Sequence, residues 1–281
     1  MRSLSPQPRC ASLITALTRI GCVLFVAFIL AYGAYAQQTS DAGSEQRLFA
    51  LINQERVKAG LPQLLYDERL ALAARKHTEF MVHEDSLSHQ LDGEEPLQLR
   101  VSDEHVRCDH DGENIALDSD LEVAHSMLMQ SPHHRDNILG PQFNAVGIGI
   151  VKSDELIYVT EDFAHVLPDY SELEADTVAQ RAIDEYAKSQ AVPVPVRKPR
   201  PQLKQMACDM ALDDQLASQK AGTLPGVSTA VAWNASDLEK LPSNLKRLLA
   251  QPLISGYSLG VCFAPSVTHP GGLYWLVMVI Y

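Results

Sequence analysis

The chain has 281 residues, of which 46% are hydrophobic and 21% are charged, and this composition is typical of a globular protein with one large or two small domains. Its formal net charge of −12 disfavours binding to the phosphate backbone of nucleic acids and to anionic membranes. We therefore expect no nucleic-acid partner.

The N-terminal segment, residues 1–36, has the layout of a secretory signal peptide. It carries three arginines and no acidic residue, then an apolar run at residues 21–31 and a small-residue end at residues 34–36. Cleavage before Gln37 makes the mature protein secreted or periplasmic, and loss of the three arginines takes the formal charge from −12 to −15. An uncleaved membrane anchor is the alternative, because residues 20–36 are near the lower length limit of a spanning helix.

Two helices are predicted next. Ser44 is positioned to cap the first, which ends at Gly60. Asp67 caps the second, in which apolar residues recur at steps of three and four as far as Met81. This face also contains His77, which we therefore expect to be buried.

Residues 83–112 are polar and rich in turn formers, and we expect a long excursion without regular structure there. The following segments predict helices at residues 120–128 and 131–140 and an antiparallel hairpin of strands at residues 146–151 and 156–163. Helices followed by a hairpin indicate an α+β layered domain.

The second half of the chain repeats this order of elements. Around a proline-rich stretch at residues 192–201, the predicted elements are helices at 173–190 and 203–216, a β-rich run at 227–233, a helix at 238–249 and strands at 258–264 and 273–281. The order indicates a degenerate internal repeat, although any two α+β segments can share it. We expect the apolar closing strands to pack against, or pair with, the first domain.

Three cysteines remain after the N-terminal segment. An oxidising compartment permits one disulfide, and Cys208 with Cys262 is the favoured pair because both lie in the second half. Cys108 is then left over. It stands beside Asp109, whose charge raises a thiol pKa, so a nucleophilic role is not expected.

Four short strings occur in order over about 120 residues of the first half. They are LINQER at 51–56 with GLP at 60–62, ARKHTEFM at 74–81 with SH at 88–89, GENIA at 112–116, and SPHHRDNIL at 131–139. Together they resemble the bacterial type of the CAP superfamily, which includes cysteine-rich secretory proteins, antigen 5 and pathogenesis-related 1 and is also called the SCP domain. The resemblance implies an α-β-α sandwich at residues 44–166, followed by a degenerate CAP-like second half at 170–281.

The resemblance also implies a cleft site. Carried over by motif, its residues are His89, Glu113 and His134, and the second glutamate of animal members falls at Ser131 here. Aligning Leu203 with Leu70 in the repeat puts Met210 opposite His77 and Thr229 opposite Glu113, with no histidine opposite His134. The second half is therefore expected to lack the site.

Two imidazoles and one carboxylate can bind zinc or another divalent cation and leave one position open for water. His89, His134 and Glu113 are therefore possible metal ligands, and Glu113 is the candidate base of a hydrolase. Histidine pairs also serve simply as hydrogen-bond partners.

Several polar residues of the same strings have structural interpretations instead. We expect hydrogen bonds that hold the domain together from His77, Asn114, Arg135 and Asn137. The histidines at positions 83, 105, 110, 125 and 133 have no recognisable partner spacing, and we expect them to be exposed.

Three functions remain open. The first is a secreted or envelope protein with a non-catalytic cleft for a small molecule, a lipid or a protein partner. The second is a metal-assisted hydrolase, such as a peptidase, that uses the same cleft. The third is a structural scaffold of the cell envelope. The missing second glutamate favours binding over catalysis.

Overall fold

The computed structural model describes residues 41–252 and 254–281. The predicted signal peptide at residues 1–36 lies outside them. Within the described part of the chain, no helix combines the length and the apolar character needed to cross a membrane.

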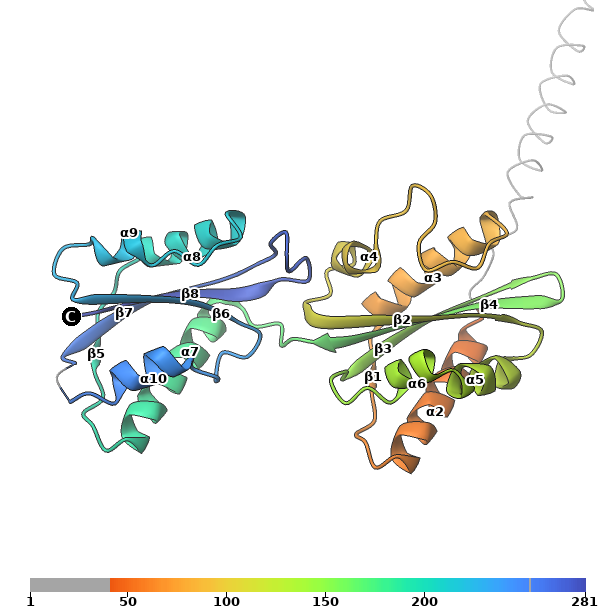
Figure 1. Cartoon of the computed structure of the whole chain (residues 1–281), viewed down its shortest axis with the longest axis horizontal. Coiled ribbons are helices and arrows are strands. Elements are labelled where there is room, and N and C mark those ends of the chain that lie inside the picture. Colours follow the sequence, from red (N-terminus) through yellow and green to blue (C-terminus); the bar gives the residue numbers. More distant parts are fainter. Residues whose placement is uncertain (1–40, 253) are drawn as a thin grey trace, which may run out of the picture. The chain divides into compact units, whose positions relative to one another are not determined.

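The first half is a four-stranded sheet between two layers of helices. Its elements are α2 (Ala42–Lys58), β1 (Leu65–Tyr66), α3 (Glu68–His83), α4 (Leu97–Asp103), β2 (Cys108–Asp118), α5 (Leu121–Gln130), α6 (Pro132–Ile138), β3 (Ala145–Ser153) and β4 (Leu156–Val166). The strand order is β1-β3-β4-β2, with β1 parallel to β3 and the other pairs antiparallel. Helices α3 and α4 cover one face, and α2, α5 and α6 cover the other (Figure 1). This half is an α-β-α sandwich.

Both faces of the central strands are buried because helices cover both. Strand β3 is buried from Ala145 to Val151, so it lacks the alternation of a half-exposed strand. One core joins Leu48 and Ile52 of α2 to Ile148 of β3, and a second joins α3 to the opposite face.

Two expectations for the secondary structure of this half were wrong. The N-cap of the first helix is Asp41, whose carboxylate accepts a hydrogen bond from the Ser44 amide, so Ser44 is not the cap. Residues 83–112 are not without regular structure, since they contain α4 and the start of β2. The pairing of β2 with β4 supplies the hydrogen bonds that favour a strand in this polar sequence.

The second half has a sheet of its own. Its elements are α7 (Glu172–Ser189), β5 (Val196–Arg197), α8 (Gln202–Leu212), α9 (Gln219–Gly222), β6 (Thr229–Ala235), α10 (Ser243–Leu249), β7 (Gly256–Ala264) and β8 (Leu273–Ile280). The strand order is β5-β7-β8-β6, and the parallel and antiparallel pairs match those of the first sheet. Of the two alternatives expected for the closing strands, pairing with the first domain was wrong, because β8 lies between β7 and β6. Packing is present at one point, where the ring of Phe263 on β7 lies 4.2 Å from the guanidinium carbon of Arg107.

Both sheets also have the same close approach between a helix and a strand. A Cβ atom on Gly147 would lie 2.0 Å from the Ala71 amide nitrogen of α3, and one on Gly260 would lie 2.2 Å from the Leu203 carbonyl carbon of α8. The expected correspondence of Leu203 with Leu70 agrees with these contacts.

The register of the sheets corrects the position opposite Glu113. Asp162 pairs with both Gly147 and Glu113, whereas Val277 pairs with both Gly260 and Ala232. Ala232 is therefore the counterpart of Glu113, and the expected match with Thr229 was wrong. Thr229 lies three positions before Ala232 on the same strand, so the expected match had the right strand but a register shifted by three residues.

Replacing Gly147 with alanine is expected to lower the free energy of unfolding by about 3 kcal/mol, because the new methyl group would meet the backbone of α3, which cannot rotate away. Urea unfolding followed by circular dichroism measures this loss. Gly43→Ala is the control, since a Cβ there would have only an ordinary contact, 3.6 Å from Asp41. Equal stability of the two variants would contradict the prediction.

Cys208 of α8 and Cys262 of β7 form a disulfide with a Cα–Cα distance of 5.3 Å. Relative to Leu203 and Gly260, these positions correspond to Arg75 and Gly149, where helix and strand of the first half also approach closely. Cys108 is free and buried, and burial followed by the charges of Asp111 and Asp109 raises the pKa of its thiol to about 12.

Candidate functional site

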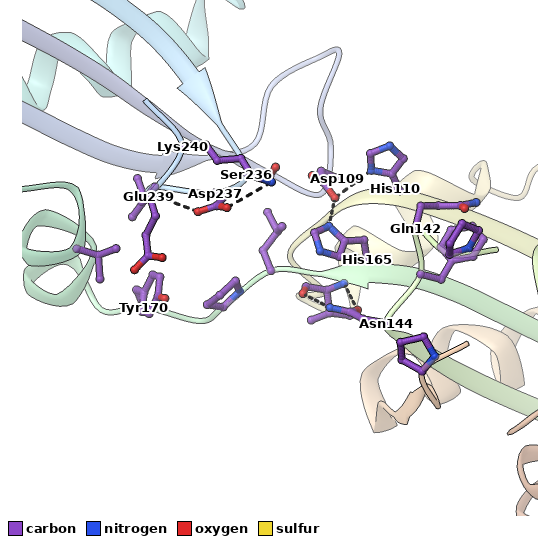
Figure 2. Close-up of a pocket in the computed structure, with 18 of the residues that line it drawn as sticks. Asp109, His110, Gln142, Asn144, His165, Tyr170, Ser236, Asp237, Glu239 and Lys240 are labelled. Atoms are coloured by element: carbon purple, nitrogen blue, oxygen red, sulfur yellow. Dashed lines mark hydrogen bonds and ion pairs between the residues drawn. The ribbon is translucent and has the colours of Figure 1, made fainter. Parts of the chain in front are cut away.

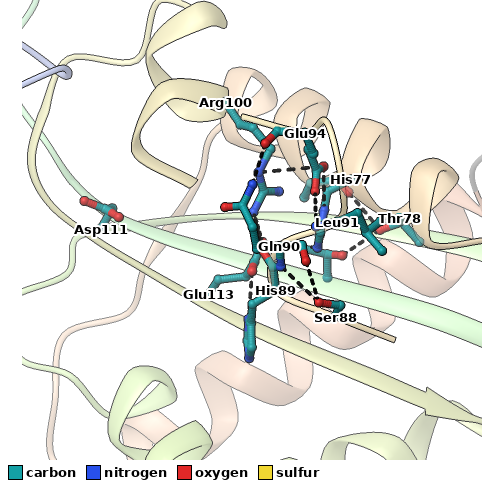
Figure 3. A network of polar contacts seen from close by, with 12 residues as sticks. His77, Thr78, Ser88, His89, Gln90, Leu91, Glu94, Arg100, Asp111 and Glu113 are labelled. Atoms are coloured by element: carbon teal, nitrogen blue, oxygen red, sulfur yellow. Dashed lines mark hydrogen bonds and ion pairs between the residues drawn. The ribbon is translucent and has the colours of Figure 1, made fainter. Parts of the chain in front are cut away.

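Glu113 is the centre of a polar network at the edge of the first sheet (Figure 3). It lies on β2, which is the edge strand, and its side chain is only 3% exposed. A carboxylate this deeply buried needs partners for its charge. The structure provides them from α3, from α4 and from the loop between these helices.

Arg100 of α4 is the principal partner of Glu113. Its Nη2 atom lies 2.7 Å from Glu113 Oε2, and the arginine side chain is 8% exposed. Its Nε and Nη1 atoms are buried without a hydrogen-bond partner among the described residues. Its other acidic neighbour is Glu94, whose Oε1 atom lies 3.8 Å from Nε, so Glu113 is the closer of two acidic partners.

His77 of α3 lies behind this pair and is fully buried, as its place on the apolar face predicted. Its Nδ1 atom is 2.7 Å from Glu94 Oε1, and its Nε2 atom is 3.7 Å from Glu113 Oε2. Figure 3 shows Glu94 and Arg100 beside it. His77 thus connects Glu94, the second acidic residue of the network, to α3.

His89 lies at the exposed end of the network. Its Nδ1 atom is 2.8 Å from Glu113 Oε1, and its side chain is 54% exposed. The Nε2 atom is on the opposite side of the ring, directed away from the network in Figure 3. His89 therefore offers one ring nitrogen to solvent or a ligand while the other is held by Glu113.

The charges of the network are set by burial and by ion pairs. Burial raises the pKa of Glu113, but the hydrogen bond with His89 and the positive charge of Arg100 outweigh it, so that the pKa is lowered from 4.5. The opposite residue on β4, Asp162, is fully buried, and desolvation, reinforced by the charge of Glu113, raises its pKa well above 3.8. Burial and the ion pairs thus shift these two neighbouring carboxyl groups in opposite directions, Glu113 toward the ionised form and Asp162 toward the neutral form.

His134 lies on α6, and the asparagines of the family strings connect this helix to β2. Asn114 Nδ2 donates to the His134 carbonyl and to Glu161 Oε2, and Asn137 Nδ2 donates to the Glu113 carbonyl. Burial, followed by the charge of His89, lowers the pKa of His134. The backbone of α6 is therefore held against the strand that carries Glu113.

Arg135 and Ser131 do not take part in this arrangement. Arg135 is exposed, and its side chain forms no hydrogen bond with the described residues, so the expected bracing role was wrong. Ser131 is the N-cap residue of α6 but makes no capping hydrogen bond with its side chain. The expected second glutamate position thus contributes no group to the network.

His89, Glu113 and His134 are not among the described side chains that bring one ligand atom each within 4.8 Å of one another. Both oxygens of Glu113 already have partners, one in His89 and one in Arg100. In the described part of the chain, a single set of three ligand side chains has its donor atoms within 4.8 Å of one another, and it consists of Asp109, His110 and His165.

Three members of the network, Arg100, Glu94 and Asp162, were not predicted from the sequence. None lies in a family string, and the distances in sequence from Arg100 and Asp162 to Glu113 are too large for a local pattern to relate them. His125 was also misjudged, because it is buried in α5 and not exposed, and burial lowers its pKa.

The fold and the site define an α-β-α sandwich whose edge strand carries a histidine–glutamate–arginine network. Residues 49–163 match the profile of the family described as "CAP: Cysteine-rich secretory protein family". Residues 49–163 of the chain are therefore a CAP domain.

Relatives with similar sequences are bacterial. The chain is 31% identical over 121 residues to the uncharacterized membrane protein YlbC of Bacillus subtilis (strain 168), covering 43% of this chain and 34% of YlbC. It is 32% identical over 120 residues to the uncharacterized protein YkwD of the same organism, covering 42% of this chain and 46% of YkwD. The chain thus spans less than half of the length of these curated relatives.

Among solved structures, an extracellular protein containing an SCP domain from Bacillus anthracis str. Ames is 31% identical, with 43% of this chain and 40% of that chain covered and a TM-score of 0.40. An outer surface protein from Borrelia burgdorferi is 17% identical, with 46% of this chain and 99% of that chain covered and a TM-score of 0.43.

Proposed function

We propose that the protein is a non-catalytic binding protein of the cell exterior or envelope, whose CAP domain holds a small molecule or lipid at His89 and His134. The observation that carries this proposal is the pairing of Glu113 with Arg100 and His89. A general base must be able to accept a proton from water or substrate. Glu113 is enclosed, and its lowered pKa makes it a weak base.

The exposed side of the network supports binding. His89 keeps its Nε2 atom free of the network, and His134 is half-buried nearby, with its pKa lowered by burial and by His89. Neutral imidazoles can donate or accept hydrogen bonds without the desolvation cost of a full charge. The secretory layout of residues 1–36 supports the proposed location.

The second half is proposed to be a copy of the CAP fold without this site. Ala232 and Val277 replace the pair Glu113 and Asp162, and Met210 stands where α3 has His77. Met210 and Val277 instead belong to an apolar cluster against which Ala232 packs. We assign this half a structural or partner-binding role.

The test combines a binding assay and an activity assay on the purified full chain. The anionic apolar dye 8-anilinonaphthalene-1-sulfonate is expected to bind, and His89→Ala with His134→Ala is expected to weaken it by about 10-fold, the effect of losing about 1.4 kcal/mol. His133→Ala is the matched control, because His133 is the exposed neighbour of His134. Dye binding that is unaffected by the double variant would contradict the binding site and favour the scaffold.

Fluorescently labelled casein, with and without added Zn²⁺, tests the hydrolase alternative. We expect no hydrolysis beyond that of a Glu113→Gln variant. Turnover that requires Glu113 would overturn the proposal and identify Glu113 as a base.

A further inference from the structure

Asp109, His110 and His165 form a second cluster, which the proposed function does not use (Figure 2). Asp109 Oδ1 lies 3.1 Å from His110 Nδ1 and 2.5 Å from His165 Nδ1. One potential ligand atom from each side chain lies within 4.8 Å of the other two. Small side-chain movements can therefore bring all three onto one ion.

A β-bulge brings these side chains together. The pairing of β2 with β4 shifts between Cys108, which faces Val166, and Asp111, which faces Ala164. Two residues of β2, Asp109 and His110, thus lie opposite one residue of β4, His165. Without the bulge, adjacent residues of a strand point to opposite faces, whereas a bulge can redirect one of them.

The surroundings of the cluster favour a cation. The Asp109 side chain is only 14% exposed, and its recorded ion pairs are with the two histidines. Burial raises the pKa of Asp109, but hydrogen bonds with Ser236, His110 and His165 outweigh this effect, and the net pKa is lowered from 3.8. The carboxylate is therefore ionised at neutral pH. The guanidinium of Arg56, which also lines the cavity beside the cluster, is already occupied by backbone carbonyls.

The cluster also has room for a further ligand. All three residues line a cavity of about 860 Å³, together with Ser236 and Asp237. Zinc sites with three protein ligands keep an additional position for water or another ligand, and imidazole nitrogen with carboxylate oxygen is a donor set that suits zinc.

We propose that Asp109, His110 and His165 bind a divalent transition-metal ion of the zinc class, with an open coordination position toward this cavity. Each histidine would coordinate through Nδ1 and carry its proton on Nε2. This tautomer change leaves the charge of the neutral ring unchanged. The site shares no ligand with the network of Glu113 and His89.

Zinc titration of the purified full chain, stripped of metal beforehand, tests this site by isothermal calorimetry. We expect one Zn²⁺ to bind, and Co²⁺ in its place to give the visible absorption bands of a low-coordinate site. Asp109→Asn and His165→Ala are each expected to lower the Zn²⁺ affinity by at least about 10-fold. Circular dichroism confirms that each variant is folded.

His83→Ala is the matched control. His83 is exposed and its Nδ1 atom lies 2.8 Å from Glu84 Oε1, so it is also a histidine paired with an acid but has no third ligand. Its removal is expected to leave the Zn²⁺ affinity unchanged. Absence of Zn²⁺ binding by the wild-type chain, unchanged affinity in both cluster variants, or loss of the ion in His134→Ala instead would overturn the proposal.

Discussion

Replacing Glu113 with glutamine is expected to lower the free energy of unfolding by about 3 kcal/mol, because removing one partner of a buried ion pair leaves the other charge uncompensated. The charge left behind is the guanidinium of Arg100, which is 8% exposed and then has only the more distant Glu94, 3.8 Å away, as an acidic partner. Urea denaturation of the purified protein measures the loss.

Two further variants separate this explanation from a general effect of mutation. Glu122→Gln breaks a pair with Arg47 whose side chains are 54% and 52% exposed, and it is expected to cost no more than about 0.5 kcal/mol. Combining Glu113→Gln with Arg100→Met removes the buried positive charge as well, and most of the stability should return. A double variant less stable than Glu113→Gln alone would contradict the ion-pair explanation.

The stability difference between wild type and Glu113→Gln also depends on pH. The pKa of Glu113 in the folded protein lies below the ordinary value of 4.5. Its ionisation therefore contributes stability that is fully present above pH 4.5 and is lost as the pH falls through the folded pKa. The two unfolding curves are expected to converge in acid, and a constant gap down to the acid limit would count against this assignment.

Removing the disulfide by Cys208→Ala with Cys262→Ala is expected to cost about 4 kcal/mol of unfolding free energy, because the crosslink closes a loop of about 54 residues in the unfolded chain. The bond joins α8 to β7, so the loss should be confined to the second half. Guanidinium denaturation with and without reductant measures it.

Reductant provides the internal control for this prediction. It should lower the stability of the wild-type protein to that of the double variant and leave the variant unchanged. Cys108 is not bonded, so Cys108→Ala should keep the full response to reductant. A wild-type unfolding midpoint that does not respond to reductant would refute the prediction.

Local signals in the sequence predicted much of the fold. Asp67 caps α3 as expected, since its carboxylate accepts hydrogen bonds from the amides of Arg69 and Leu70. The spacing of apolar residues also placed His77 on the buried face of that helix. Both signals act between residues within one or two helical turns, so they can be read without the rest of the fold.

The elements that were misread depend on contacts between distant residues. Strand β2 begins in a polar sequence and is stabilised by its pairing with β4, which no local pattern reveals. The counterpart of Glu113 in the second half could likewise be found only from the register of the two sheets.

By itself, the sequence determined the family, the order of helices and strands and the residues of the family strings, because these depend on local preferences and short motifs. The tertiary structure alone decided what Glu113 and His165 contact. Arg100 reaches Glu113 across 13 residues, and Asp109 meets His165 across 56. Such pairs form only when packing brings separate elements together, and the energy of a buried charge depends on every group that packing places around it.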